Sequence, residues 1–519
     1  MHIGVDVGGT NTDAALMQGN SVLASIKSPT TEDIGSGVVG AIRSVLDQTG
    51  ADVSQITSVM IGTTQFTNAF VEGKKLVPVA TFRAALPATE SLLPMVEFPK
   101  HLADPIGRVS YLFKGGYEFD GREIAPLDEA AVAEAARDMK KRGISSAAVS
   151  CVFTPINDAM EKRIAEIIRA EAPDTRITLS SELGRVGLIE RENATIMNAS
   201  LADLAITVVN AFRSALAELN LTCPFYISQN DGTLMSAEFA EKYPVLTFAS
   251  GPTNSMRGAA FLSGIKDGIV VDIGGTTSDV GVLKDGFPRE SAISVDIGGV
   301  RTNFRMPDVL AIGVGGGSIV RQTDKGLTIG PDSVALNLLS EALVFGGKTL
   351  TTTDISVAAG YADIGDKSKV AHLDKEMVAE AVELMHTMIE EAVDRVKSGK
   401  GNVPVILVGG GSILVNRDLK GASKVVKPEL SGTANAIGAG LAQVGGEVDK
   451  IYSYTHLGRE DSIAQAKEEA VERAVSAGAD RQSISIVNLE ELPLAYLPAG
   501  AVRIKTKAIG DLALEEFAQ

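Results

Sequence analysis

Apolar and polar positions follow one another along the chain in two different rhythms. Short apolar runs such as 3–7 and 147–153 have the length and the boundaries of buried strands. Longer segments such as 127–141 and 377–396 repeat apolar residues at helical spacing, and Asp374 supplies a cap for the second of them. Strand-like and helix-like segments alternate throughout, and this alternation predicts a layered α/β fold.

The clearest organisational feature is an internal repeat. Residues 3–13 read IGVDVGGTNTD, and residues 269–279 read IVVDIGGTTSD. Each copy predicts an apolar strand, a Gly-Gly turn and a second strand, and the copies lie in opposite halves of the chain. Two related units so far apart favour two homologous lobes over a solenoid of short repeats. We therefore expect lobes at 1–180 and 181–445, followed by a small C-terminal α/β appendage at 446–519.

Both copies of the repeat carry the same chemistry. Asp6 and Asp272 end the first strand of each copy, where a carboxylate can hold Mg²⁺ directly or through water. Asp13 and Asp279 are predicted to orient water or the loop, which makes four candidate catalytic carboxylates. The Gly-Gly turns expose backbone N–H groups that bind anionic oxygens. One copy alone is equally typical of an ordinary hairpin turn, whereas two copies in register favour a phosphate site.

We expect these two loops to clamp the phosphates of ATP from opposite lobes. The predicted nucleotide ligands are Gly8, Gly9, Thr10, Asn11, Thr12, Gly274, Gly275, Thr276 and Thr277. A third element, the run VILVGGGS at 405–412, is a strand that enters three glycines. Gly409, Gly410 and Gly411 would let the backbone pack against an adenine ring and a ribose. The small residues of 434–441 favour close packing between lobes, although ordinary helix packing explains them nearly as well.

Composition narrows the function further. The chain has 519 residues, a formal charge of −17, and 45% hydrophobic residues, which is typical of a globular protein. Net negative charge argues against nucleic acid, and no apolar run reaches the ~20 residues that span a bilayer. Cys151 and Cys223 are isolated and the five histidines are scattered, which argues against a disulfide framework or a zinc site. We expect a cytoplasmic protein.

The order DVGGT, DIGGT, VGGGS resembles the superfamily of actin, sugar kinases and chaperone ATPases. More specifically, the chain is similar to the hydantoinase/oxoprolinase family, in its hydantoinase A-type subunit. The segments that carry this resemblance are IGVDVGGTNTD at 3–13, IGTTQFTNA at 61–69, LSSE at 179–182 with Glu190-Arg191, QNDG at 229–232, SGP at 250–252, DIGGTTSD at 272–279 and IGVGGGS at 312–318.

The resemblance implies a two-lobed, actin-like (ribonuclease H-like) fold that uses ATP with Mg²⁺ or Mn²⁺. It also implies ATP-dependent opening of a cyclic amide, such as a hydantoin or 5-oxoproline, through phosphorylation of the carbonyl oxygen. Related members carboxylate ketones. A hydantoinase B-type partner subunit, within a homo- or hetero-oligomer, is expected. Candidate substrate contacts are Thr63, Thr64, Asn68, Asp231, Asp308 and Gly316, although a structural role for the first three is equally consistent with the sequence.

The chain departs from the family pattern at three places. Where the family commonly has Asp-x-His-Thr, this chain has Asp308-Val309-Leu310-Ala311, so the histidine is absent. The stretch 333–345 replaces a Pro-Gly-Pro-type segment, and the C-terminal region is shorter. These departures keep two other hypotheses open. One is a small-molecule kinase of the same fold, and the other is a non-catalytic, ATP-gated activator of a partner enzyme.

Overall fold

Two sheets with the same strand order form the centre of the molecule. The computed structural model describes residues 1–9, 11–31, 33–291, 294–324, 326–441, 443–495 and 500–513. The first sheet contains β1 (His2–Val7), β2 (Asn11–Gln18), β3 (Ser21–Pro29), β4 (Ser58–Thr63) and β9 (Phe225–Ser228) in the order β3-β2-β1-β4-β9. The second contains β11 (Gly268–Ile273), β12 (Ser278–Lys284), β13 (Phe287–Pro288), β19 (Val403–Val408) and β20 (Ala422–Val426) in the order β13-β12-β11-β19-β20.

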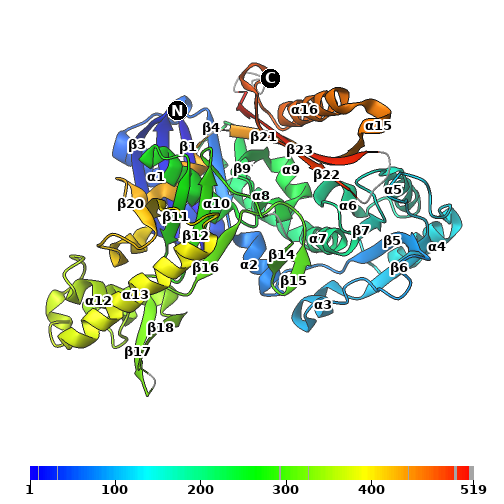
Figure 1. The fold of residues 1–519 in the computed structure, drawn as a ribbon. Coiled ribbons are helices and arrows are strands. Elements are labelled where there is room, and N and C mark those ends of the chain that lie inside the picture. Colours follow the sequence, from blue (N-terminus) through cyan, green and yellow to red (C-terminus); the bar gives the residue numbers. More distant parts are fainter. Residues whose placement is uncertain are drawn as a thin grey trace.

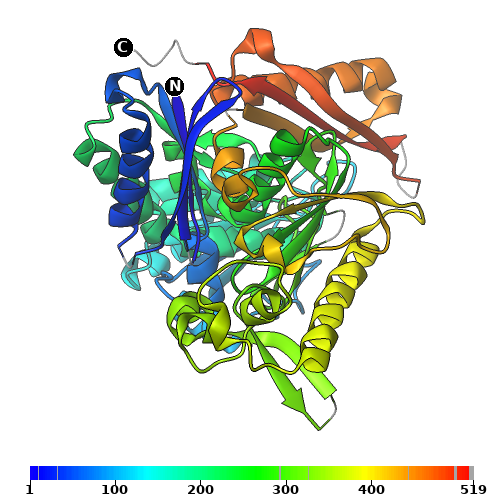
Figure 2. The same ribbon diagram turned by 90° about the vertical axis from the view of Figure 1, so that its left-hand side faces the viewer.

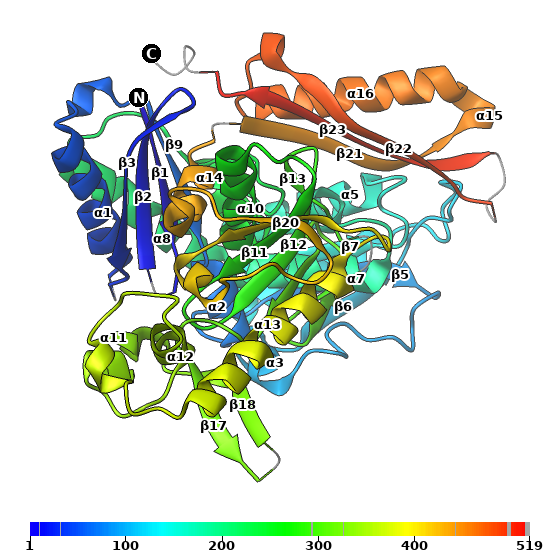
Figure 3. The same ribbon diagram turned by 60° about the vertical axis from the view of Figure 1, so that its left-hand side comes forward.

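Strand directions also agree between the two sheets. In each sheet, three consecutive strands pair antiparallel. A fourth strand pairs parallel with the first of them, and a fifth pairs parallel with the fourth. This is the ribonuclease H-like arrangement, and its presence twice confirms the predicted actin-like fold with two related lobes. Figure 3 shows the two sheets, β1–β3 in blue and β11–β12 in green, on either side of α14 (Ala434–Ala439) and α10 (Ser250–Ser263).

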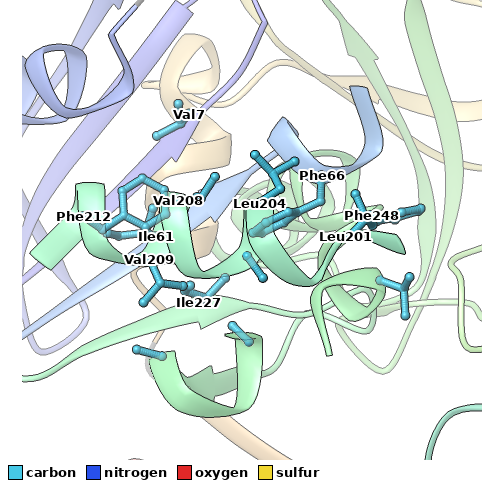
Figure 4. Packing of buried hydrophobic residues seen from close by; sticks show 14 of the residues in the cluster. Val7, Ile61, Phe66, Leu201, Leu204, Val208, Val209, Phe212, Ile227 and Phe248 are labelled. Atoms are coloured by element: carbon cyan, nitrogen blue, oxygen red, sulfur yellow. The ribbon is translucent and has the colours of Figure 1, made fainter. Parts of the chain in front are cut away.

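Helices cover the first sheet because its strands are apolar on both faces. Residues of β1 from Ile3 to Val7 are buried. On one side lie α1 (Ile34–Thr49), capped by Asp33, and α8 (Ala202–Glu218). Figure 4 shows the resulting core, which joins side chains of the sheet to those of α8 and its neighbours: Val7, Ile61, Phe66, Leu201, Leu204, Val208, Val209, Phe212, Ile227 and Phe248. This packing holds the carboxyl end of β1 in a fixed position.

A separate four-stranded parallel sheet is inserted between β4 and β9. It consists of β5 (Ala80–Leu86), β6 (Val109–Lys114), β7 (Ser146–Cys151) and β8 (Arg176–Leu179), in the order β6-β5-β7-β8. The helices α4 (Glu129–Lys141) and α5 (Ala159–Glu171) pack on it, and α4 lies within the helix predicted at 127–141. Because parallel strands need a crossover connection, the path from β4 to β9 has room for a whole domain. The first lobe therefore continues beyond the predicted boundary at residue 180.

The second sheet is covered by α13 (Lys375–Val396), the helix predicted from its spacing and from its cap at Asp374. β16 (Val309–Ile312) joins this sheet through β12, and beside the sheet lie the hairpin of β17 (Ser318–Thr323) with β18 (Gly326–Ser333) and α12 (Thr352–Ala358). In Figure 1, α13 and this hairpin extend away from the inserted sheet.

The C-terminal segment continues the first sheet instead of forming a separate appendage. Its strands β21 (Gln443–Ser453), β22 (Ser485–Pro493) and β23 (Ala501–Asp511) join through β10 (Leu234–Ser236) in the order β22-β23-β21-β10-β9. The helix α16 (Arg459–Ser476) presents buried alanines to these strands. Figure 2 shows this orange-to-red layer along the upper side of the molecule. The expected appendage thus has the predicted α/β content, but its strands pair with the lobe.

Shorter elements complete the fold of the described ranges. They are α2 (Gln65–Val71), α3 (Lys100–Ile106), α6 (Ser180–Leu183), α7 (Leu188–Ser200), α9 (Ala237–Lys242), α11 (Leu338–Glu341), α15 (Tyr454–Leu457), β14 (Val295–Ile297) and β15 (Val300–Thr302). In the part of the chain that the structure describes, no single helix is long and apolar enough to cross a membrane. Only α7 and α8 taken together, with a bend of 54° between them, reach that length and composition.

Glycines bring the two lobes together at α10 and α14. A Cβ at Gly258 of α10 would overlap the carbonyl of Ala434, and a Cβ at Gly438 of α14 would overlap the carbonyl of Asn254. On the other side of α14, a Cβ at Gly4 of β1 would overlap the carbonyl of Ala436. The backbones therefore touch along this line, as the small residues at 434–441 predicted.

Candidate active site between the two hairpins

Strand register places the four predicted carboxylates in two facing pairs. Asp6 of β1 lies opposite Asp13 of β2, and Asp272 of β11 lies opposite Asp279 of β12. The turns that join these strands are closed in the same way, because the N–H of the first glycine donates to a carbonyl three residues ahead. These bonds join Gly8 to Asn11 and Gly274 to Thr277, both at 2.9 Å. The internal repeat of the sequence is thus a repeat of backbone geometry.

Asparagines from the two connecting helices hold Asp6. The side-chain amide of Asn254 on α10 donates to Oδ1 at 3.2 Å, and that of Asn435 on α14 donates to Oδ2 at 3.0 Å. Burial and the nearby Asp13 raise the pKa of Asp6, whereas the two amides and Lys27 oppose the rise, and the resulting pKa is about 6. Asp6 is therefore fixed in position by groups of both helices.

Lys27 on β3 is the cation of the site. Its ammonium lies 2.5 Å from Oδ2 of Asp13, whose side chain is fully buried. Burial raises the pKa of Asp13, and Lys27 opposes that rise. The charge of Lys27 also acts on Asp272, although that residue belongs to the other lobe, and Asp272 in turn acts on Asp13. The carboxylates of the two hairpins therefore share one electrostatic environment.

The second hairpin has fewer polar partners. Burial raises the pKa of Asp272, while a hydrogen bond with Ser255 of α10 and the charge of Lys27 lower it. For Asp279, burial and the neighbouring Asp272 raise the pKa to about 7. A carboxyl group with a pKa near neutrality can accept or release a proton at physiological pH, which makes Asp279 the candidate acid–base group of the site.

Two glycine segments of the second lobe pack against the second hairpin loop. The N–H of Gly316 donates to the carbonyl of Gly274 at 2.9 Å, which places this predicted substrate contact directly on the loop. Gly409 has a φ of +84°, and a Cβ there would overlap Oδ1 of Asp272. A Cβ at Gly411 would lie 2.8 Å from the carbonyl of Gly274. The run that includes Gly410 is thus part of the wall of the second loop, and a nucleotide role for it remains a prediction.

The predicted residues of 61–69 lie beside the first loop. The backbone N–H of Thr64 donates to the carbonyl of Val7 at 3.3 Å, and the backbone of Thr63 bonds to the hydroxyl of Ser250 on α10. A Cβ at Gly9 would lie 3.9 Å from the side-chain amide of Asn68. These residues therefore border the space in front of the first loop. Thr10 lies outside the described residues.

Asp231 and Asp308, by contrast, are paired with cations elsewhere. Asp231 lies 2.8 Å from Lys507 of β23 and 3.6 Å from Arg305, and these charges lower its pKa to about 2 against the effect of burial. Asp308 lies 2.5 Å from Arg289. The structure groups neither residue with the hairpin carboxylates. A substrate contact for either residue stays a prediction.

Four residues of the site were not predicted from the sequence: Lys27, Asn254, Ser255 and Asn435. For Lys27 a signal was present, because a three-stranded antiparallel meander places β3 beside the polar face of β2, where Lys27 lies opposite Asp13. The other three reach the carboxylates through α10 and α14, which pack from distant parts of the chain.

The site fits a divalent cation that arrives with a nucleotide. Oδ1 of Asp13 is buried without a hydrogen-bond partner, and the pKa values of all four carboxyl groups are raised, so added positive charge would be favourable. The residues that the structure describes contain no cluster of three or more His, Cys, Asp or Glu that could hold a metal alone. Phosphate oxygens and water would supply the remaining ligands, as Mg²⁺ prefers. Asp6 and Asp272 are the residues that would hold it.

Fold and site together define a two-lobed protein of the actin-like class, with paired carboxylates and a glycine turn contributed by each lobe. Comparison with known proteins narrows this class. A model of the hydantoinase/oxoprolinase N-terminal region matches residues 2–172, and a hydantoinase/oxoprolinase model matches residues 191–396. The chain belongs to the hydantoinase/oxoprolinase family.

Individual relatives are more distant. The chain is 28% identical to caprolactamase subunit alpha of Pseudomonas jessenii, over 69% of this chain and 54% of that protein. It is 26% identical to the acetophenone carboxylase gamma subunit of Aromatoleum aromaticum, over 69% of this chain and 53% of that protein. The chain thus spans about half the length of the curated relatives it matches.

Solved structures agree with the fold. The crystal structure of the ATP-dependent caprolactamase from Pseudomonas jessenii matches with a TM-score of 0.79 at 19% identity, covering 100% of this chain and 88% of that one. A nucleotide-free structure of acetone carboxylase matches with a TM-score of 0.70 at 17% identity, covering 99% and 88%.

Proposed function

We propose that this chain binds Mg-ATP between its two hairpins and uses it to open a cyclic amide, together with a B-type partner subunit. The observation that carries this proposal is the shared environment of Lys27 and the four carboxylates, which come from two related loops in different lobes. Family membership and the similarity to a caprolactamase subunit point to a lactam or hydantoin-like ring as the second substrate.

The chemistry follows from what an amide needs. Amide resonance makes the carbonyl carbon a poor electrophile, and transfer of the γ-phosphoryl group to the carbonyl oxygen removes that protection. Water then attacks the carbon and the ring C–N bond breaks, with the nitrogen leaving as an amine. A second water hydrolyses the resulting acyl phosphate to the carboxylate and phosphate. In total, one cyclic amide, one ATP and two waters give one amino acid, ADP and phosphate. Mg²⁺, when bound, would supply positive charge to the phosphates.

Residues of this chain would perform the remaining tasks. The N–H groups of the two loops would hold the phosphates, since oriented backbone amides bind anions. Asp279, with its pKa of about 7, would take the proton of the attacking water. Leu310, which occupies the position of the family histidine, lies on β16 next to β12 and packs against the core of the second lobe. The family histidine is therefore not available here, and we propose Asp279 in its place as the acid–base group.

The test is a phosphate-release assay on the purified chain, with and without its partner subunit. We expect lactams, hydantoins or 5-oxoproline to stimulate ATP turnover, and we expect Asp6→Ala and Asp272→Ala to abolish the stimulation. If no cyclic amide changes the rate in the presence of the partner, the proposed hydrolysis is wrong.

Product analysis separates this proposal from the alternatives. The similarity to an acetophenone carboxylase subunit favours carboxylation of a ketone as the second candidate, with the same phosphoryl activation of a carbonyl group. Mass spectrometry would distinguish a ring-opened amino acid, a carboxylated ketone and the stable phosphate ester of a small-molecule kinase. An ATP-gated activator would instead show nucleotide-dependent binding to its partner and a turnover that no small molecule changes.

A further inference from the structure

A second cavity lies between the lobes, at the end of the sheets that is opposite to the hairpin loops. Its volume is about 720 Å³, which is in the range of small-molecule sites. β1 begins in its wall at His2 and ends at the nucleotide loop, so six residues at ~3.3 Å each put about 20 Å between the two places. Its lining includes His2, Asn20, Ser58, Arg257, Asp285 and Asp511.

A buried arginine without an acidic partner lines this cavity. Arg257 of α10 is 7% exposed, and its guanidinium lies 3.8 Å from the centre of the Phe287 ring. It donates to the carbonyl of Gly286 at 3.0 Å and to the side chain of Gln443, while its Nε has no hydrogen-bond partner. Among the described residues, no carboxylate lies within ion-pair distance of it. Burial lowers the pKa of Arg257 to about 10, although the charge of Asp231, which lies beyond ion-pair distance, opposes this effect.

A second unsatisfied polar group lies in the same wall. The hydroxyl of Ser58 is buried, with the residue 1% exposed, and it too lacks a hydrogen-bond partner. Buried polar groups are satisfied in the large majority of cases, so two such groups in one cavity indicate a missing ligand. Asp285 and Asp511 also line the cavity, together with the exposed Lys266. The wall therefore offers a cation and a hydroxyl in its depth, and two acids besides.

One helix connects this cavity to the candidate active site. α10 carries Asn254, which holds Asp6, and Ser255, which bonds to Asp272. Arg257 follows within a single turn of the same helix and faces the cavity. Because both lobes contribute to the walls, any rigid-body closure of the crevice changes the shape of the cavity as well.

We propose that this cavity is an effector site for a small amino acid, whose carboxylate binds Arg257 and Ser58 and whose ammonium faces Asp285 and Asp511. A planar carboxylate matches the guanidinium fork, and the two acids disfavour a doubly charged anion such as phosphate. Ring opening of a cyclic amide yields a molecule of this type, so the ligand would be a product that regulates its own formation. That last step rests on the proposed function, whereas binding of the amino acid does not.

The experiment is calorimetry on the full chain without nucleotide. Three probes share a five-carbon chain, namely 5-aminopentanoate, pentanoate and pentylamine, and the fourth is inorganic phosphate. We expect the amino acid to bind most tightly, pentanoate more weakly, and pentylamine and phosphate not at all. A concentration of about 10 mM is well above a millimolar dissociation constant, so the proposal is wrong if the amino acid gives no heat there. Tighter binding of phosphate than of pentanoate would also overturn it.

Substitutions in the cavity wall test where the amino acid binds. We expect Arg257→Met to abolish binding and Ser58→Ala to weaken it by about three- to tenfold, the loss of one hydrogen bond. Arg43→Met, which removes an exposed arginine of α1 in the first lobe, is the control and should bind normally. If Arg257→Met does not fold, Ser58→Ala and the blocked mouth of Asn20→Trp decide the question. Unchanged binding in both of these would show that the ligand lies elsewhere.

Coupling is tested separately with ADP. If the two sites communicate through α10, a saturating amino acid changes the affinity for ADP by some factor, and ADP changes the affinity for the amino acid by the same factor. Failure of the ATPase assay would leave these binding results unaffected, and the two proposals can therefore fail independently.

Discussion

The two hairpins share one backbone and differ in what surrounds their carboxylates. In the first lobe, two asparagines hold Asp6 and a lysine pairs with Asp13. In the second lobe, Asp272 has a serine and Asp279 has only the repulsion of its neighbour, which helps raise its pKa to about 7. This difference indicates that the two hairpins have different roles. The first hairpin is fixed and charged, whereas the second keeps a group that can exchange a proton.

The largest effect is expected from Asp272→Asn. Loss of this charge removes a contact to the cation of the nucleotide, and we expect ATP turnover to fall by about 10²–10³-fold, as when a main electrostatic contact of a transition state is removed. Phosphate release measures it. Asp267→Asn changes an exposed acid just before β11 and should leave turnover unchanged. A loss no greater than that of this control would contradict the role of Asp272.

Each cation-facing carboxylate has a glycine against it, and the two glycines should differ in sensitivity. A Cβ at Gly62 would overlap Asp6, and a Cβ at Gly409 would overlap Asp272. Only Gly409 has a positive φ, of +84°, so alanine there adds backbone strain to the steric clash. We expect Gly409→Ala to lower the free energy of unfolding by about 3–4 kcal/mol and Gly62→Ala by about 1–3 kcal/mol. Urea denaturation compares them, and the reverse order would be evidence against this explanation.

Lys27→Met should have a smaller effect that is confined to the site. It leaves Asp13 buried without its ion-pair partner and raises the pKa of that carboxyl group, since Lys27 opposes the effect of burial. We expect the affinity for Mg-nucleotide to fall by about tenfold, equivalent to about 1.4 kcal/mol. Lys27→Arg keeps the charge and should recover most of the affinity. If Arg and Met variants bind equally weakly, the size of Lys27 matters and not its charge.

The smallest expected effect is a change in pH dependence. The folded-state pKa of Asp279, about 7, lies above its ordinary value of 3.8, so the folded state binds the proton more strongly than the unfolded state. Its contribution to stability is therefore present at low pH and is lost as the pH rises toward 7. We expect Asp279→Asn to raise the Tm of the nucleotide-free chain by ~2–4 °C at pH 8, and by less at pH 5. Equal shifts at both pH values would contradict the assignment.

Much of the site could be predicted because it is local in sequence. An apolar strand, two glycines and a second strand can form only a hairpin, and its register then forces Asp6 to face Asp13 and Asp272 to face Asp279. The two lobes followed from the repeat of that hairpin. Local patterns carried both conclusions.

The rest depends on contacts between distant segments. Asn254 and Asn435 reach Asp6 only because α10 and α14 cross beside β1. Strand pairing over long separations also decided that the C-terminal strands extend the first sheet. The ion pair of Asp231 was not predicted for the same reason, since its partner Lys507 lies near the far end of the chain. A carboxylate in a sequence shows its charge but not its counterion.

The crossing of α10 and α14 limits which positions of the protein can accept substitutions during evolution. Main-chain atoms approach main-chain atoms at Gly258 and Gly438, so any side chain at either position would overlap the backbone of the other helix. Changes in substrate specificity are therefore expected among residues around the candidate site, whereas Gly258 and Gly438 should tolerate almost no substitution. In a saturation-mutagenesis library selected for activity, we therefore expect almost no substitutions at these two positions and many among residues around the candidate site.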